Sequence, residues 1–237
     1  MIIDWLVFII LVAVPTVYII LGFYYKGTKP PRDLLKFYLY DNLPFLIPVV
    51  VILILNFSLI NPDISDIDQG FPIEDKYISL IAGIFLVPFF IAFLPTDTNF
   101  PKEDIRNVKE IFGFDTALMP NNLIQLAAFF FFIVIGVVLE EIFFRQFMFS
   151  SFHTTLNIEG DWLVVITAIM FGVGHLYQGV RGFISSFLLG LATGKVYLLT
   201  GNILIPIIMH LSINLTIVVY AIRRMIALNR LKKKGLY

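Results

Sequence analysis

Three charged side chains lie close together in a part of the chain that is otherwise apolar. The stretch Leu123–Ser150 carries Glu140, Glu141 and Arg145 in its second half. A charged side chain at membrane depth costs at least ~2.5–3.5 kcal/mol. Two adjacent carboxylates in such a stretch therefore indicate a chemical role.

Two later apolar stretches carry further polar side chains at helical spacing. Phe171 precedes His175 by four residues, and His210 precedes Asn214 by four. The i, i+4 spacing places both members of each pair on one face of a helix. Two of the three histidines in the chain thus lie in apolar sequence, as the two glutamates do.

These residue types suit the hydrolysis of a peptide bond. A carboxylate in surroundings of low dielectric can act as the general base that takes a proton from water, and Glu140 is the candidate. His175 and His210 can hold and polarise that water or donate to the tetrahedral intermediate. Asn214 is a candidate oxyanion donor of the side-chain amide type.

Two other charged groups and one aromatic ring have structural interpretations. Glu141 and Arg145 stand at i, i+4 with the acid first, and we expect them to neutralise each other. We expect Phe171 to pack around His175.

The composition indicates a polytopic membrane protein. Of the 237 residues, 59% are hydrophobic and only 14% are charged, which is far from the average of soluble proteins. The chain has no cysteine, which excludes a disulfide framework, a thiolate metal site and a cysteine nucleophile.

Apolar runs long enough to cross a bilayer need about 20 residues each. The sequence predicts an all-α transmembrane bundle of seven spans, with room for an eighth interfacial or re-entrant helix around Gln146–Asp161. The predicted spans are Ile2–Tyr25, Leu43–Ile60, Tyr77–Leu94, Leu123–Ser150, Trp162–Tyr177, Gly182–Leu199 and Asn202–Ile222. We divide the chain into N-terminal membrane helices (1–122), a candidate catalytic core (123–222) and a basic cytoplasmic tail (223–237).

The charges of the loops predict the orientation. Basic residues follow the first and last spans, whereas the loop Asn61–Lys76 is acidic. Basic loops stay on the cytoplasmic side, so we expect the N-terminus outside and the C-terminus inside. With a rise of 1.5 Å per residue, Glu140, His175 and His210 then lie roughly 15, 20 and 12 Å from the outer end of their helices. The three motifs are thus expected to meet at one intramembrane site.

The motifs resemble those of the CAAX-protease and bacteriocin-processing (Abi) family of intramembrane proteases. The family signature is EExxxR, then FxxxH, then HxxxN on successive membrane helices, and all three are complete over Glu140–Asn214. The resemblance covers Leu123–Tyr220, and it matches Met1–Asn122 only as extra membrane helices. It implies that the first glutamate is catalytic, that both histidines and the asparagine complete the site, and that no metal is obligatory.

A zinc site is the minority interpretation. His175 and His210 with one or two glutamates would make a plausible zinc set with an open position for water. The helical His-Glu-x-x-His signature is absent, however, and Asn61-Pro62-Asp63 only faintly matches a motif of intramembrane zinc proteases. Neither the Gly-x-Gly-Asp of aspartyl intramembrane proteases nor a rhomboid-like serine nucleophile occurs. We expect no required cofactor.

The sequence therefore predicts an intramembrane endopeptidase in the plasma membrane of a prokaryote. Its expected partners are the lipid bilayer and a membrane-associated peptide or lipidated protein as substrate, with no nucleic acid. A hydrophobic peptide precursor is the favoured substrate. The alternatives are a non-enzymatic scaffold or bacteriocin-immunity protein and a proton-coupled transporter; the latter more often shows an internal repeat.

Two further features concern packing. Ser186, Gly190 and Gly194 form a stripe of small residues that predicts close packing of helices. Lys195 is expected to snorkel to the membrane surface, or to pair with an acid in the cavity.

Overall fold

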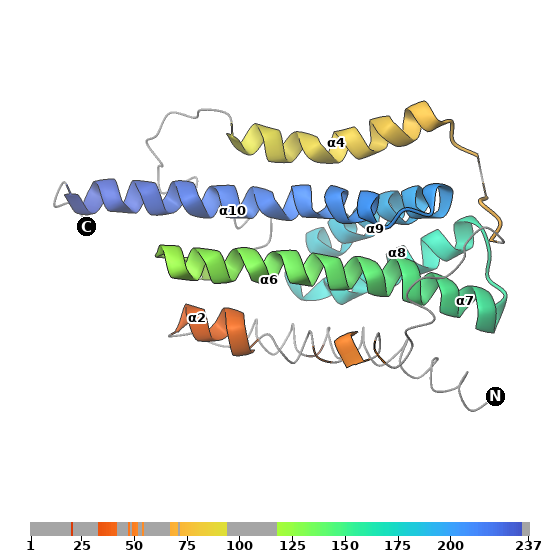
Figure 1. Ribbon diagram of the computed structural model, residues 1–237, viewed down its shortest axis with the longest axis horizontal. Helices are drawn as coiled ribbons and strands as arrows, with labels where there is room; N and C mark the ends of the chain where they lie inside the picture. Colours follow the sequence, from red (N-terminus) through yellow and green to blue (C-terminus); the bar gives the residue numbers. More distant parts are fainter. Residues whose placement is uncertain are drawn as a thin grey trace.

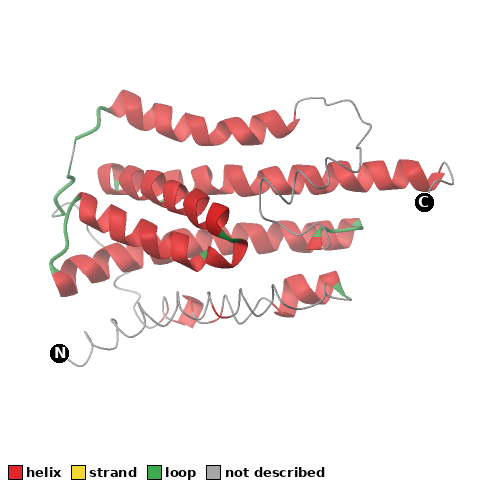
Figure 2. Ribbon diagram, turned by 180° about the vertical axis from the view of Figure 1, so that it is seen from behind, coloured by secondary structure: helices red, strands yellow, loops and turns green. Residues whose placement is uncertain are grey.

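The computed structural model describes residues 20, 33–41, 47, 49–51, 54, 67–70, 72–93 and 118–233. Helices are the regular structure of this part of the chain, and no strand occurs in it (Figure 2). The predicted spans Ile2–Tyr25 and Leu43–Ile60 lie almost entirely outside the described residues. The all-helical fold is thus confirmed for the described part.

The first motif lies on one long, uninterrupted helix. Helix α6 (Leu123–Glu141) continues through a π-helical turn, η4 (Ile142–Phe147), into α7 (Met148–Leu156). The left-handed backbone of Asn157 ends the helix. The eighth, re-entrant helix considered around Gln146–Asp161 is therefore not a separate element, because α7 extends α6 beyond the predicted span.

The remaining described elements are α2 (Leu34–Lys36), η1 (Phe37–Asp41), α4 (Asp75–Phe93), α8 (Asp161–Gly174), η5 (Leu176–Gln178), α9 (Val180–Thr200) and α10 (Leu204–Lys233). Helices α4 and α9 match their predicted spans closely, whereas α8 is shorter than predicted. Helix α10 runs well past Ile222, so the predicted basic tail is helical as far as Lys233.

The structure supports an integral membrane protein but does not fix the number of spans. Three helices are long and apolar enough to cross a membrane: Leu123–Leu156, Val180–Thr200 and Leu204–Arg230. The apolar helices Tyr77–Pro88 and Asp161–Gly174 are shorter. Large hydrophobic side chains are exposed along α4, α6 and α10, as lipid-facing surfaces require.

Helices α8 and α9 pack closely, as the stripe of small residues predicts. A Cβ atom added to Gly190 would lie 3.0 Å from Ala168 Cα, and one added to Gly194 would lie 3.2 Å from Val164 Cγ1. Only glycine lets the two backbones approach this closely. The two helices form a tightly packed antiparallel hairpin.

The arrangement of the helices determines where along the bundle the site lies. Helix α10 contacts α4, α6 and α9. Figure 1 shows α6 and α9 running in one direction and α4, α8 and α10 in the other. The turn between α8 and α9 lies partway along the bundle rather than at its end (Figures 1 and 2). Residues of this turn therefore lie at the depth of the last part of α6.

Lys195 pairs with an acid at one end of the bundle. Its Nζ donates to Asp161 Oδ1 at 2.6 Å and to the carbonyl oxygen of Gln69 at 2.9 Å. The pair joins the C-terminal half of α9 to the start of α8 and to the loop before α4. Lys195 thus pairs with an acid, but this acid begins α8 and is not in the cavity as the predicted alternative required.

Candidate active site

Two adjacent glutamates at the end of α6 have different surroundings. The Glu141 side chain is fully buried, whereas 22% of the Glu140 side chain is exposed. The π-helical turn η4 begins at the next residue. Such π-helical turns occur often at functional sites, because the extra residue in the turn changes which faces the flanking residues present.

Glu141 connects two of the predicted motifs. Its Oε2 accepts from Arg145 Nε at 2.9 Å, which confirms the predicted pair, and its Oε1 accepts from His210 Nδ1 at 2.8 Å. Arg145 Nη2 also donates to Thr193 Oγ1 at 2.8 Å. All four side chains are buried. The sequence analysis assigned Glu141 only to Arg145, so its bond to His210 is an addition from the tertiary structure.

Phe171 contacts both histidines as well as the buried arginine. The Arg145 guanidinium lies 5.5 Å from the centre of the Phe171 ring. The same ring meets the imidazole of His175 edge-on at 4.7 Å between centres, and that of His210 at 5.6 Å. The predicted packing of Phe171 on His175 is confirmed. Phe171 also fixes His210, because the two rings pack directly against each other.

The partners of the two imidazoles determine which nitrogens face the site. His175 ends α8, and its Nδ1 donates to the Phe171 carbonyl oxygen at 2.8 Å, since a carbonyl can only accept. His210 Nδ1 donates to the carboxylate of Glu141. In both neutral rings the lone pair is therefore on Nε2. Each Nε2 can accept a proton or, once protonated, donate one.

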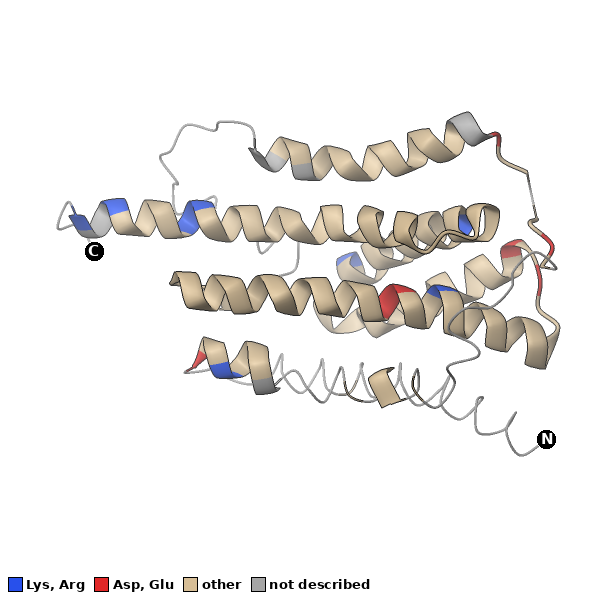
Figure 3. Cartoon of the chain, viewed as in Figure 1, with Lys and Arg blue, Asp and Glu red and all other residues tan. Residues whose placement is uncertain are grey.

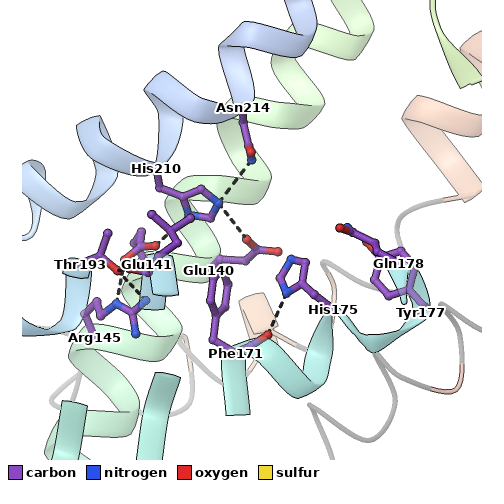
Figure 4. Close-up of polar contacts among 11 residues, drawn as sticks. Glu140, Glu141, Arg145, Phe171, His175, Tyr177, Gln178, Thr193, His210 and Asn214 are labelled. Carbon is purple, nitrogen blue, oxygen red and sulfur yellow. Dashed lines mark hydrogen bonds and ion pairs between the residues drawn. The ribbon is translucent and has the colours of Figure 1, made fainter. Parts of the chain in front are cut away.

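The four predicted catalytic side chains come together from three helices. Glu140 Oε2 lies 3.8 Å from His210 Nε2, and Asn214 Nδ2 lies 3.4 Å from the same nitrogen. Figure 4 shows the Glu140 carboxylate between the rings of His210 and His175. The expected convergence of the motifs is thus found in the structure. A base, two imidazole nitrogens and an amide donor share one site.

Three further residues at the site were not singled out from the sequence. Thr193 binds Arg145, and Tyr177 and Gln178 flank His175 in the turn η5. Thr193 lies next to the last glycine of the small-residue stripe, which is the only signal that could have indicated it. Tyr177 and Gln178 have no helical spacing to His175, since they lie in a turn.

The zinc alternative requires a third protein ligand beside the two histidines. Within the described part of the chain, no three His, Cys, Asp or Glu side chains are grouped so as to hold a metal ion. His210 Nδ1 and His175 Nδ1 both have protein partners. This leaves one nitrogen of each ring for any other ligand.

Comparisons with known proteins agree with the position of the site. Residues 122–216 match the family model described as type II CAAX prenyl endopeptidase Rce1-like. No curated protein and no solved structure matches the chain. The matched segment contains α6 to α9 and the first half of α10, and thus every residue of the site.

Proposed function

Because residues 122–216 belong to the Rce1-like family of type II CAAX prenyl endopeptidases, we propose that this integral membrane protein is an intramembrane endopeptidase. It would hydrolyse a peptide bond in a membrane-associated or lipidated peptide. The observation that carries the proposal is the meeting of Glu140, His175, His210 and Asn214 from three helices at one site.

In the proposed mechanism, Glu140 and His175 hold the attacking water. The carboxylate of Glu140 and Nε2 of His175 are both acceptors, so one water molecule can donate a hydrogen to each. This arrangement turns a lone pair of the water toward the scissile carbonyl. Glu140 takes the proton as the carbon–oxygen bond forms.

His210 and Asn214 stabilise the resulting tetrahedral intermediate. The amide of Asn214 donates to the oxyanion, and His210 does so when its Nε2 carries a proton. The Glu141 carboxylate accepts from the opposite nitrogen and holds the ring with Nε2 toward the site. Glu140 then gives its proton to the leaving nitrogen as the carbon–nitrogen bond breaks, so water is consumed and an acid and an amine result.

The position of the site supports a membrane-associated substrate. The motif residues lie along apolar helices, so the scissile bond would enter the membrane region or lie beside it. A prenylated CAAX sequence, as named in the family description, and a hydrophobic peptide precursor both meet this requirement. We propose the precursor as the natural substrate and a prokaryotic plasma membrane as the location.

The charges at the two ends of the bundle support the proposed orientation. Figure 3 shows most of the basic residues at the end that holds α2 and the last turns of α10, and acidic residues before α4 and at the start of α8, where Lys195 pairs with Asp161. By the positive-inside rule, the C-terminus lies in the cytoplasm. Reporter fusions after Lys233 should score cytoplasmic, and fusions at Asp68 should score external. A cytoplasmic score at Asp68 would contradict this orientation.

The proposed function is tested with purified protein in lipid nanodiscs. One fluorescent substrate ends in a farnesylated CAAX sequence, and a second is a hydrophobic peptide without lipid. Mass spectrometry identifies the products. We expect Glu140→Gln to lower kcat by about 10²–10⁴-fold, the range for loss of a general base. The matched control is Glu159→Gln, at an exposed position outside the site, which should cleave as the wild type does.

Two outcomes would contradict the proposal. If Glu140→Gln turned over at the wild-type rate, the water-activating role of Glu140 would be wrong. If folded wild-type protein cleaved neither peptide, the non-enzymatic alternatives would be favoured instead.

A further inference from the structure

The turn between α8 and α9 is held in a defined shape beside the catalytic groups. It contains η5 (Leu176–Gln178) and Gly179, whose φ of +90° favours glycine. A Cβ atom on Gly182 would lie 2.4 Å from Gln178 Cβ and 3.0 Å from the His175 carbonyl oxygen. The absence of that atom lets the turn fold onto the first turn of α9. The position of Gln178 is therefore set by its contact with α9.

Gln178 in turn orients the phenol of Tyr177. Its Nε2 donates to Tyr177 Oη at 3.0 Å, and both side chains are half-buried. The phenol oxygen accepts this bond, so its own hydrogen remains available to donate to another group.

The Tyr177 ring also extends the wall of the site that His175 begins. The rings of His175 and Tyr177 are stacked, with 6.2 Å between their centres and 26° between their planes. Phe171 packs on His175 as well. Figure 4 shows Tyr177 and Gln178 on the side of His175 that faces away from His210. His175 thus lies between the oxyanion donors and the Tyr177–Gln178 pair.

Tyr177 lies on the side of the His175 imidazole opposite the Glu140 carboxylate, and it stacks on that imidazole (Figure 4). A peptide whose scissile carbonyl is at Glu140 would therefore pass the phenol with its neighbouring residues. A backbone carbonyl is the acceptor that such a peptide presents regardless of its side chains.

We propose that Tyr177, oriented by Gln178, binds the substrate by donating its hydroxyl hydrogen to a backbone carbonyl next to the scissile bond. This inference rests on the proposed peptidase function and adds a substrate-binding residue outside the three motifs. The bond would be made equally in the bound substrate and in the transition state. Its loss should then raise KM and leave kcat almost unchanged.

The first test is the kinetics of Tyr177→Phe in nanodiscs with the farnesylated peptide. Phenylalanine keeps the stacking on His175 and removes only the hydroxyl, so we expect KM to rise about tenfold and kcat to stay within about twofold. Gln178→Met, which cannot orient the phenol, should raise KM by a smaller factor. The matched control is Tyr197→Phe, which removes a hydroxyl from a buried tyrosine that packs on Phe149. KM should not change in that variant.

The second test needs no turnover. The labelled peptide is titrated into Glu140→Gln protein and into the same protein carrying Tyr177→Phe, and the dissociation constants are compared. We expect about tenfold weaker binding in the double variant. Equal binding by both proteins would overturn the role of Tyr177. So would a lower kcat at unchanged KM in Tyr177→Phe, or a loss of activity that is fully explained by a smaller amount of folded protein. If wild-type protein neither bound nor cleaved either peptide, the proposed function itself would fail.

Discussion

Replacement of Glu141 by glutamine tests the arrangement of the site most directly. Glutamine has nearly the same shape, but it removes a buried negative charge that two groups share. The single amide oxygen of glutamine can accept from Arg145 or from His210 but not from both, and the Arg145 guanidinium, whose Nη1 has no hydrogen-bond partner among the described residues, loses the carboxylate that neutralises it. Removing one partner of a buried ion pair costs ~3–5 kcal/mol. We expect a loss of stability of this order, measured as the melting temperature in detergent.

Activity should fall in Glu141→Gln for a separate reason. The carboxylate accepts from His210 Nδ1 and thereby orients the imidazole, and a hydrogen bond to a charged group contributes about 1.5–3 kcal/mol. With about 1.4 kcal/mol for each factor of ten, the rate per folded molecule should fall roughly 10- to 150-fold. The measurement is kcat/KM, corrected for the fraction of folded protein.

The double variant Glu141→Gln with Arg145→Met separates the two effects. Methionine removes the unpaired cation. The double variant should therefore be about 1–3 kcal/mol more stable than the sum of the two single losses of stability predicts. Its activity per folded molecule should stay low, because His210 still lacks the carboxylate. If activity returned together with stability, Glu141 would act only through Arg145, and the role assigned to its bond with His210 would be refuted.

Two other predictions concern metal dependence and packing. His175→Ala and His210→Ala should each inactivate the enzyme, and added zinc should not restore activity. Chelators should not affect the wild type. Stoichiometric zinc in the purified protein, together with a reversible loss of activity on chelation, would show that the histidines are metal ligands instead. Gly190→Ala should lower the stability by ~1–3 kcal/mol, because its Cβ would lie 3.0 Å from the α8 backbone. Gly83→Ala should raise the stability by about 0.4–1 kcal/mol, because a Cβ there would meet nothing within 4 Å. Equal melting temperatures of the two glycine variants would contradict the packing argument.

Much of this protein could be predicted from the order of its residues alone. Long apolar runs require helices, because a backbone in lipid must satisfy its own hydrogen bonds. Charges such as Glu140 and Glu141 within these runs are costly, so they indicate function without any structure. The i, i+4 spacings fixed the pairing of Glu141 with Arg145 and the packing of Phe171 on His175, because both are local properties of one helix. The stripe that contains Gly190 predicted the contact of α8 with α9 in the same way.

Contacts between residues of separate helices could be found only in the tertiary structure. The bond of Glu141 to His210 and that of Arg145 to Thr193 join residues far apart in the sequence, so no spacing could indicate them. The π-helical turn after Glu141 was also missed, since hydropathy does not distinguish an α-helical turn from a π-helical one. Helix α8 ends partway along the bundle (Figure 1), and Tyr177, in the turn that follows, stacks on His175. The sequence supplies the chemical groups and their helical faces, whereas the packing of α6, α8 and α10 determines which of these groups meet at one site.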